Sequence, residues 1–422
     1  MPDKFKVRVG SEIGRLTGVV MHEPGQEVAN MTPETAERAL YSDILNLEVA
    51  RQEYAQLRGV LGRRARIFQV RELLEDILGN DRVRGGLVRR ICDAEGAPQL
   101  VDDLLARGPA DLARLLIEGV PLTRDNLSRF LSADRYSLPP LHNFFFTRDA
   151  AATVGDSVLI AAMASTVRGR EARIMEAIFD YHPGLDATTV NPARLAGPDP
   201  GLTIEGGDVL VAAPGILIVG IGARTTAKAV DYLIDRFREQ GGTQHILVQE
   251  LPKTPESFIH LDMVFTLLDR HLCLVYEPVV LQTHHFDVVH IHVEAGSVVS
   301  ITEQGTLLAG LARLGLELEP VYCGGRDDRW LQEREQWHSG ANVFALGPGQ
   351  VVGYGRNANT LQELARAGFA VVPAAEVIGG AVDLDTVGRC IVTIDGSELA
   401  RGGGGCRCMT MPVGREPLDA VS

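Results

Sequence analysis

Short apolar runs bounded by Gly, Pro and Asp dominate the chain after Pro140. Runs of this length are typical of buried β-strands, because an amphipathic helix needs a longer segment with a three- to four-residue spacing. The pattern predicts strands at residues 157–162, 209–213, 216–221, 246–249, 272–276, 343–346, 351–354 and 369–372. Helical stretches lie between several of these strands, which indicates an α/β fold.

The N-terminal segment begins with another strand-like run at residues 17–22, which the turn dipeptide Pro24-Gly25 ends. Thr32 and Pro33 follow as an N-cap and a proline at the first helical position. Apolar residues then recur at helical spacing from Ala36 through Leu40 to Leu57. We predict one long amphipathic helix over this segment.

Residues 71–135 differ from their surroundings, because their apolar pairs recur at helical spacing with almost no β-branched alternation. Leu73-Leu74, Ile77-Leu78 and Leu115-Leu116 are examples. We predict an inserted helical domain at residues 71–135, which Pro139 and Pro140 follow. Residues 1–70 and 136–422 would then form the α/β part.

One order of elements occurs twice along the chain. A Pro-Gly turn, a strand, a helix opened by an arginine, and a second strand appear within residues 213–251 and again within residues 347–372. Residues 156–181 and the N-terminal segment show looser versions of this order. We therefore expect a pseudo-symmetric array of ββαβ modules.

Composition narrows the class of protein. The 422 residues are 45% hydrophobic, which is enough for a large core, and the net charge of −14 without any block of Lys or Arg argues against nucleic-acid binding. No segment approaches the roughly 18 uninterrupted apolar residues of a membrane helix. Six scattered cysteines are too few for a disulfide framework and favour a reducing, cytoplasmic location.

Four segments concentrate charged and polar residues among glycines and apolar neighbours: residues 143–149, 205–208, 260–262 and 402–409. If the segment around His260 and Asp262 is a strand, both side chains point to the same face. A surface strand with two polar residues is the alternative. The pair Gly206-Gly207 permits close approach of a backbone or ligand, although a tight turn explains it equally well.

Two further residues suggest chemistry. Asp149 follows Arg148 and three phenylalanines, so its charge must be paired or must bind something, and an internal ion-pair network is the competing interpretation. Cys408 follows four glycines and a Cys-Arg pair. A nucleophilic cysteine needs its thiolate, which nearby cations stabilise, whereas a lone cysteine is usually a small core residue.

A group of histidines supports a rival hypothesis from another class of enzyme. His284, His285, His290 and His292 lie close together in the sequence, and a His-x-His pair on a strand can bind a metal. Such histidines more often lie solvated at a sheet edge. The rival is a metal-dependent amidohydrolase, which would lose activity with a chelator and tolerate a change of Cys408.

Seven segments in order resemble the arginine deiminase family of guanidino-modifying enzymes. They are Ser11-Glu12-Ile13-Gly14-Arg15-Leu16 with His22-Glu23-Pro24-Gly25, Phe146-Thr147-Arg148-Asp149, Ile204-Glu205-Gly206-Gly207-Asp208, His260-Leu261-Asp262, Arg334-Glu335-Gln336-Trp337, Gly353-Tyr354-Gly355-Arg356-Asn357 and Arg407-Cys408-Met409-Thr410-Met411-Pro412. The resemblance implies a pseudo-fivefold α/β propeller, the pentein fold, of ββαβ modules with an inserted helical bundle. It also implies hydrolysis of arginine to citrulline and ammonia through a covalent S-alkylthiouronium intermediate, without metal or organic cofactor.

The resemblance assigns roles to five residues. Cys408 matches the nucleophile that attacks the guanidinium carbon. Asp149 and Asp262 match the carboxylates that hold the guanidinium by charge-assisted hydrogen bonds. His260 matches the acid that protonates departing ammonia and then the base that activates water, and Glu205 matches a second acid/base carboxylate.

The resemblance also marks four substrate-binding positions. Asn143, Arg168 and Arg224 match residues that bind the α-carboxylate, and Phe146 lies at the start of the segment that contains Asp149. These residues favour an amino-acid substrate over a decarboxylated amine such as agmatine. Helix-capping and surface arginines are the alternative interpretation.

The sequence departs from the family pattern near the nucleophile. Gly403 stands where many members carry an arginine, and Cys406 stands where they carry glycine. The loop at residues 338–342 lacks the commoner acidic residue, and residues 379–395 are longer than usual. Another guanidino substrate, or transfer of the amidine to an amine, therefore remains an alternative, while five competent catalytic side chains argue against a binding-only relative. Self-association into a homo-oligomer is common for soluble enzymes of this size.

Overall fold

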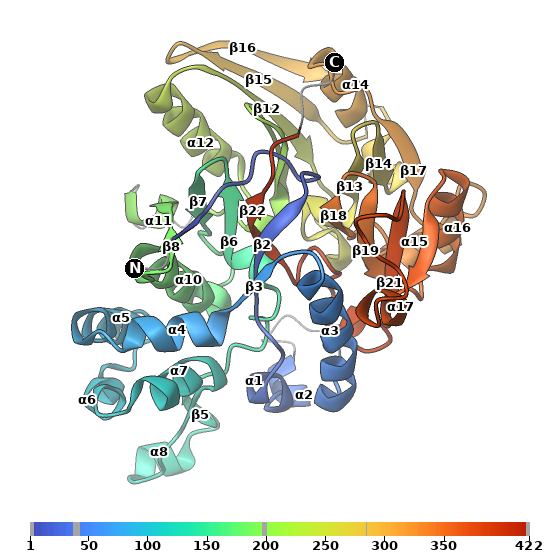
Figure 1. Ribbon diagram of the computed structural model, residues 1–422. Helices are drawn as coiled ribbons and strands as arrows, with labels where there is room; N and C mark the ends of the chain where they lie inside the picture. The colour runs from blue at the N-terminus through green and yellow to red at the C-terminus, as the bar shows by residue number, and fades with distance from the viewer. Residues whose placement is uncertain (1–3, 37–42, 196–200, 284, 419–422) are drawn as a thin grey trace.

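Five sheets of the same construction surround one axis in the computed structural model, which describes residues 4–36, 43–195, 201–283 and 285–418 (Figure 1). In each sheet, an antiparallel pair of strands is extended by a third, parallel strand. The five sets are β22 (Met411–Arg415), β2 (Leu16–Met21) and β3 (Arg66–Gln69); β6 (Ala151–Val154), β7 (Ser157–Ile160) and β9 (Thr188–Val190); β10 (Val209–Ala213), β11 (Ile216–Ile221) and β12 (Thr243–Glu250); β13 (Phe265–Asp269), β14 (Leu272–Val275) and β17 (Glu319–Tyr322); β18 (Phe344–Gly347), β19 (Gln350–Tyr354) and β21 (Cys390–Ile394). The predicted pseudo-fivefold α/β propeller is confirmed.

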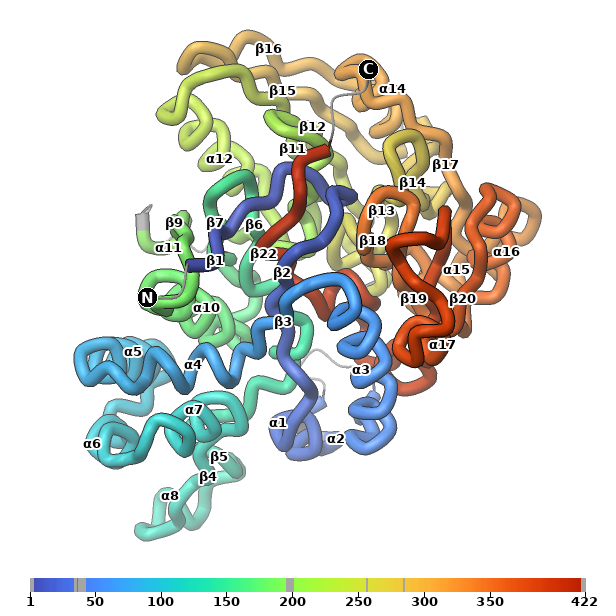
Figure 2. Tube along the Cα trace, in the orientation of Figure 1, coloured from blue at the N-terminus to red at the C-terminus, as the bar shows by residue number. Residues whose placement is uncertain are grey.

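The two ends of the chain meet in the first module. Strand β22 runs antiparallel to β2, and Figure 2 shows this C-terminal segment in red beside the blue N-terminal one. Short β1 (Phe5–Lys6) also pairs with β8 (Leu185–Asp186), which belongs to the next part of the ring. The ring is therefore closed by the residues that directly follow Cys408.

A helix connects the second and third strands of each module and covers the outside of the ring (Figure 1). These helices are α3 (Leu47–Gly62), α10 (Gly169–Tyr181), α12 (Ala227–Gln240), α14 (Leu307–Arg313) and α16 (Ala358–Arg366). Further helices outside the insert are α1 (Gln26–Ala29), α9 (Thr147–Ala150), α11 (Pro192–Leu195), α13 (Glu277–Val280) and α15 (Arg329–Trp337). All eight strands predicted from apolar runs are found within a few residues, as β7, β10, β11, β12, β14, β18, β19 and β20 (Ala370–Pro373).

The prediction of one long helix from residue 33 to residue 57 is wrong. Helix α2 (Pro33–Ala36) is short, and α3 begins only at Leu47, while the predicted position Leu40 lies outside the described residues. The cause is Asn46, whose side chain accepts hydrogen bonds from the backbone N–H groups of Glu48 and Val49. Asparagine in this capping geometry starts a new helix.

The two repeats found in the sequence differ in strand pairing. Helix α12 leads to β12, which pairs directly with β11. Helix α16 leads to β20, but β21 lies between β20 and β19, because α17 (Ala374–Ile378) and the following loop return the chain into the sheet. The third module is instead widened by the hairpin of β15 (Val288–Glu294) and β16 (Ser297–Gln304).

Residues 70–131 are largely helical, as the spacing predicts: α4 (Val70–Leu78), α5 (Asp81–Ala94), α6 (Val101–Leu105), α7 (Pro109–Glu118) and α8 (Leu127–Leu131). A small pair of strands, β4 (Val120–Pro121) and β5 (Tyr136–Leu138), follows. Leu73 and Ile77 belong to the same apolar core as Val20, Val158 and Met411. The helices therefore share a core with the first two modules, and an independent domain at residues 71–135 stays a prediction.

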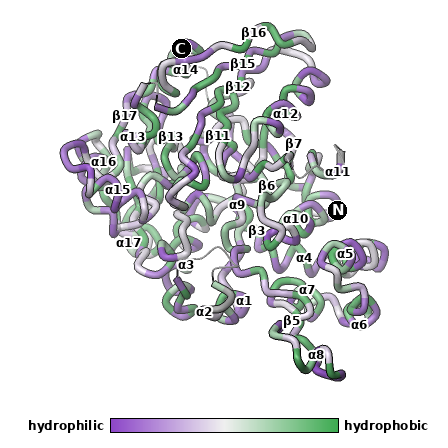
Figure 3. Tube along the Cα trace, turned by 180° about the vertical axis from the view of Figure 1, so that it is seen from behind, coloured by the Kyte–Doolittle hydropathy of each residue, from purple (hydrophilic) through white to green (hydrophobic). Residues whose placement is uncertain are grey.

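Hydropathy follows this architecture. Outer turns of α5 and α16 are hydrophilic in Figure 3, whereas α8 carries an exposed apolar face of Leu127, Phe130 and Leu131. Within the described ranges, the helices are too short or too polar to cross a membrane.

Candidate active site

Cys408 lies in a turn directly before β22, near the centre of the ring. The backbone N–H groups of Arg407 and Cys408 donate to Asn342 Oδ1, at 3.0 and 3.1 Å. The carbonyl of Cys408 accepts a hydrogen bond of 3.1 Å from the backbone N–H of Arg148. These bonds fix the thiol, which is only 3% exposed, at the wall of a cavity.

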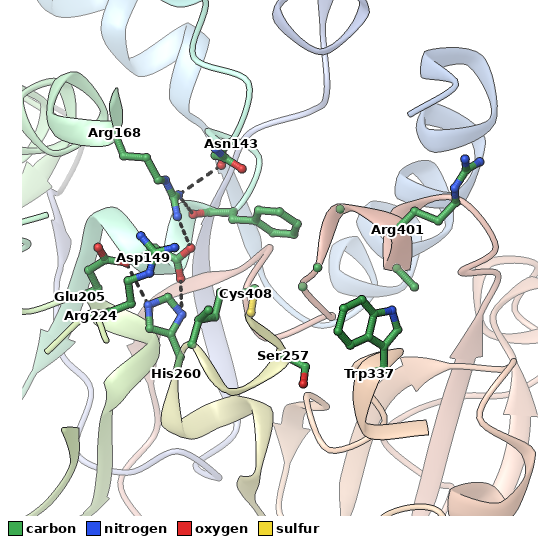
Figure 4. Close-up of a pocket in the computed structure, with 16 residues that line it drawn as sticks. Asn143, Asp149, Arg168, Glu205, Arg224, Ser257, His260, Trp337, Arg401 and Cys408 are labelled. Atoms are coloured by element: carbon green, nitrogen blue, oxygen red, sulfur yellow. Dashed lines mark hydrogen bonds and ion pairs between the residues drawn. The ribbon is translucent and has the colours of Figure 1, made fainter. Parts of the chain in front are cut away.

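The structure brings most of the predicted site residues together around this cavity (Figure 4). Asp262 is the exception, since it lies behind the thiol with both carboxylate oxygens 3.9 Å from Cys408 Sγ. The predicted residues that line the cavity are Asn143, Phe146, Asp149, Arg168, Glu205, Arg224, His260 and Cys408. Trp337, Ser257, Ile259 and residues 400–404 complete the wall.

His260 and Asp262 do not lie on a strand, so that expectation is wrong. The segment turns into a short 3₁₀ helix, Leu261–Met263, because Asp208 Oδ1 accepts a hydrogen bond of 2.8 Å from the backbone N–H of Leu261. The turn separates the two side chains. His260 faces the cavity, whereas Asp262 reaches beneath Cys408 toward Arg407.

His260 is held between two carboxylates. Its Nε2 lies 2.9 Å from Glu205 Oε2, and its Nδ1 lies 3.5 Å from Asp149 Oδ1. Burial alone would lower the pKa of His260, but Asp149, Glu205 and Asp208 outweigh burial and raise this pKa to about 9. Burial would likewise raise the pKa of Glu205, and the hydrogen bond from His260 reverses that effect. An imidazolium beside carboxylates results.

Gly206 and Gly207, directly before Asp208, form a tight turn and also allow another group to approach closely. Residues Gly206–Asp208 form a 3₁₀ turn. A Cβ atom on Gly207 would lie 2.5 Å from His260 Nδ1, so only glycine lets the imidazole pack against this turn. Burial raises the pKa of Asp208, which ends the turn, to about 7.

Asp149 forms an ion pair with Arg168 rather than with its neighbour Arg148. Arg168 Nη1 donates to Asp149 Oδ2 at 2.6 Å. The same guanidinium donates to Glu171 Oε2 from Nε at 3.1 Å and from Nη2 at 2.7 Å. Glu171, Arg168 and Asp149, each at most 5% exposed, are named the Glu171 triad below.

Asp262 has the same kind of partner. Arg407 Nη1 donates to Asp262 Oδ2 at 2.7 Å, while its Nε and Nη2 donate to Glu12 Oε2 and Oε1, both at 3.1 Å. Glu12, Arg407 and Asp262, each at most 6% exposed, are named the Glu12 triad. Both triads thus consist of a buried carboxylate, a guanidinium and a second carboxylate.

The thiol of Cys408 lies between the two triads. Burial raises its pKa well above the ordinary range, Asp262 and Asp149 raise it further, and Arg407 only partly opposes them. The thiol is therefore protonated in the free protein. A cation bound beside both carboxylates would lower this pKa and favour the thiolate.

The predicted cations at the cavity differ in whether they are already paired. Arg168 belongs to its triad, whereas Arg224 makes no hydrogen bond or ion pair within the described part of the chain. Gly403 lines the cavity, and a Cβ there would meet open space. Arg401 also lines the cavity, but its guanidinium points away from Cys408 in Figure 4 and pairs with Asp43 and Glu398.

Sequence reasoning missed four buried residues that support the site: Glu12, Glu171, Asn342 and Arg407. Glu12 and Arg407 stand inside segments that resemble the family, which was a usable signal. Their partnership spans 395 positions, so no local pattern could reveal it. Asn342 lies in the loop noted above as a departure from the family pattern, and that loop supports the nucleophile.

The histidines of the rival hypothesis lie elsewhere. His290 and His292 are on β15, where His245 Nδ1 lies 3.0 Å from His290 Nε2 and the rings of His245 and His292 stack at 4.5 Å. Among the described residues, His, Cys, Asp and Glu side chains form no group of three suited to a metal. His284 lies outside the described residues.

Comparison with known proteins defines first a class and then a family. The fold is shared with SxtG, an amidinotransferase from Microseira wollei, at 12% identity and a TM-score of 0.52 over 98% of both chains. It is also shared with the N-terminal domain of ArgZ, an arginine dihydrolase from cyanobacteria, at 13% identity and a TM-score of 0.51 over 94% of this chain and 97% of that one. The protein is therefore a pentein.

Sequence similarity makes the assignment narrower. The family model described as arginine deiminase matches residues 112–415. An arginine deiminase of Bacillus cereus is 33% identical over 98% of this chain and all of its own length. The chain belongs to the arginine deiminase family, and the resemblance seen in the motifs is confirmed.

Proposed function

We propose that the protein hydrolyses L-arginine to L-citrulline and ammonia, with Cys408 as the nucleophile. One observation carries this proposal: the Cys408 thiol, the His260 imidazolium and the Asp149 carboxylate line one cavity, and the Asp262 carboxylate lies directly behind the thiol. Membership of the arginine deiminase family supports the reaction.

Substrate binding would activate the nucleophile. A guanidinium is a planar cation, and carboxylates bind it through paired, charge-assisted hydrogen bonds. Asp149 Oδ1, 3.5 Å from His260 Nδ1, accepts no hydrogen bond from the described residues, while Asp262 lies next to the sulfur. Neutralisation of these carboxylates by the substrate removes the part that they add to the raised pKa of the thiol, and the bound cation favours the thiolate.

The first half-reaction forms a C–S bond. The thiol of Cys408 loses its proton to solvent when the substrate binds, and the thiolate attacks the guanidinium carbon. The tetrahedral adduct collapses when one terminal nitrogen takes a proton from His260 and leaves as ammonia. The product is an S-alkylthiouronium that still carries the amino-acid chain. The imidazole is then neutral and can act as a base.

The second half-reaction consumes one water. Neutral His260 removes one proton as water attacks the thiouronium carbon, and the C–S bond then breaks as the hydroxyl proton of the adduct passes to the departing sulfur, which releases citrulline and the Cys408 thiol. Glu205, 2.9 Å from His260 Nε2, orients the imidazole and stabilises its protonated form. The sum of both steps is arginine plus water giving citrulline plus ammonia.

The amino-acid end of the substrate would meet Arg224. Arg224 lines the cavity and makes no hydrogen bond or ion pair with the residues that the structure describes, so it can bind an α-carboxylate without breaking one. Asn143 and Phe146 line the same space, whereas Arg168 is already balanced by two carboxylates. We assign Arg224 the main contact and place the reaction in the reducing cytoplasm, which suits six buried free thiols.

The test is a product assay with purified protein, in which L-arginine and agmatine are supplied in parallel. We expect citrulline and equal amounts of ammonia from arginine, much less product from agmatine, no product with Cys408→Ser, and no effect of a chelator. Activity that survives Cys408→Ser and disappears with the chelator would instead support the metal-dependent rival.

A further inference from the structure

Asp149, at the cavity wall, and Asp262, behind the Cys408 thiol, share one supporting arrangement. Asp149 is bound by Arg168, and Asp262 is bound by Arg407, through single hydrogen bonds of 2.6 and 2.7 Å. Each arginine gives two hydrogen bonds to a second carboxylate, Glu171 or Glu12, neither of which lines the cavity. The arrangement occurs twice near one sulfur, since both aspartates influence Cys408, although the residues come from unrelated segments.

Arg168 and Arg407 alone would weaken the attraction of the site for a cationic ligand. A carboxylate paired with one guanidinium is neutral overall, and a neutral pair attracts a cationic ligand far less than a free carboxylate does. The buried location makes this loss larger, because water does not screen the charges there. A second carboxylate on each arginine restores one net negative charge to each triad.

We propose that Glu12 and Glu171 are positioning residues that keep Asp262 and Asp149 anionic toward a bound guanidinium. The arginines fix the orientation of the two aspartates, and the glutamates cancel the charge that this orientation introduces. The inference rests on the proposed function, since it assumes a guanidinium ligand between the triads.

Glutamine at either position preserves shape and removes the charge, so Glu12→Gln and Glu171→Gln are the matched tests. Glu176→Gln is the control, because Glu176 lies on the same helix as Glu171, is 3% exposed, and pairs with Arg90 and Arg194 away from the cavity. Each of the three changes removes one buried carboxylate that forms an ion pair with arginine. Only the first two alter a triad.

The first readout is binding in a Cys408→Ser background, which prevents turnover. Calorimetry with L-arginine and with L-citrulline compares a cationic ligand with its neutral counterpart. We expect Glu12→Gln and Glu171→Gln each to raise the Kd of arginine about tenfold or more and to leave the Kd of citrulline nearly unchanged. Equal changes for both ligands, or none, would overturn the proposal.

The second readout is the pH dependence of Cys408 alkylation by iodoacetamide in the otherwise native chain. The charged groups that face this thiol are Asp149 and Asp262, with Arg407 behind it and His260 across the cavity. Loss of one negative charge should move the alkylation midpoint to lower pH in Glu12→Gln and Glu171→Gln, and leave it in place in Glu176→Gln. A general rise in rate without a shift of the midpoint would show loosened packing and contradict the proposal.

The two readouts separate this inference from the proposed function. If the Cys408→Ser protein binds no arginine at all, the assignment of the substrate fails. The alkylation midpoints then decide alone whether the glutamates set the charge around Cys408.

Discussion

The Glu12 and Glu171 triads have the same order of charged groups, but they lie in opposite surroundings. Around Asp149, the carboxylates of Glu171, Glu205 and Asp208 lie near Arg168, Arg224 and the imidazolium. Burial, Asp149 and Glu205 raise the pKa of Glu171 despite Arg168. The Glu171 triad is therefore an anion-rich wall of the cavity.

The Glu12 triad lies in an arginine-rich layer behind the nucleophile. Burial would raise the pKa of Glu12, yet Arg407, Arg148 and Arg415 lower it to about 2. Arg168 lines the cavity and Arg407 does not. The difference teaches that one triad can respond to a ligand, whereas the other is a fixed support that joins the first residues of the chain to the last.

The largest expected effect is the loss of either aspartate. Asp149→Asn or Asp262→Asn should lower kcat/KM for arginine by about hundredfold or more, equivalent to about 3 kcal/mol, because one partner of a buried charge pair is lost. Steady-state kinetics at saturating and limiting arginine measures this. A loss below about tenfold for either variant would mean that its triad does not hold the guanidinium.

The next largest effect is on the pH dependence of kcat/KM, which His260 sets at the anion-rich wall of the cavity. His260 must be protonated to release ammonia, and its pKa is raised to about 9, so kcat/KM should fall as pH rises through that range. Glu205→Gln removes a carboxylate that raises this pKa, so the alkaline limb should move to lower pH. Since Cys408 and His260 titrate as a coupled pair, apparent pKa values from the profiles belong to the pair. A flat profile from mildly acidic to mildly alkaline pH would contradict the acid/base assignment.

A smaller effect is expected at the mouth of the cavity, where Arg224 lies on the Asp149 side (Figure 4). Arg224→Met should raise KM for arginine about tenfold and change kcat little, because it removes a contact to the carboxylate far from the reacting carbon. Agmatine lacks that carboxylate, so its KM should not change. Equal effects on both substrates would assign Arg224 another role.

The smallest expected effect is a difference in the free energy of unfolding between variants of the two triads. Lysine cannot reproduce the two-pronged contact of arginine. Arg407→Lys breaks contacts among Glu12, Asp262 and the carbonyl of Val209, which lie far apart in sequence. The hydrogen bonds of Arg168 within the described part of the chain go to residues 143–171. Urea unfolding should show Arg407→Lys to be less stable than Arg168→Lys by about 1 kcal/mol, and the reverse order would contradict the supporting role of the Glu12 triad.

Local patterns predicted the strands well, because strands depend on short segments, whereas the cavity residues were marked by the resemblance to the family. Val209–Ala213 and Ile216–Ile221 were placed to the residue from their apolar runs. The capped start of α3 at Asn46 was missed, because apolar spacing continued across the break. The triads could not be predicted at all, since Glu12 reaches Arg407 only after β2 and β22 close the ring.

The central claim is that Cys408 attacks the guanidinium carbon and retains the amino-acid chain. Acid quench during turnover of L-arginine, followed by mass spectrometry of the Cys408 peptide, tests it directly. The account predicts an adduct on Cys408 with the mass of arginine less ammonia. An adduct that carries only an amidino group would show transfer chemistry with the amine as leaving group, and an unmodified Cys408 under the same conditions would contradict the account.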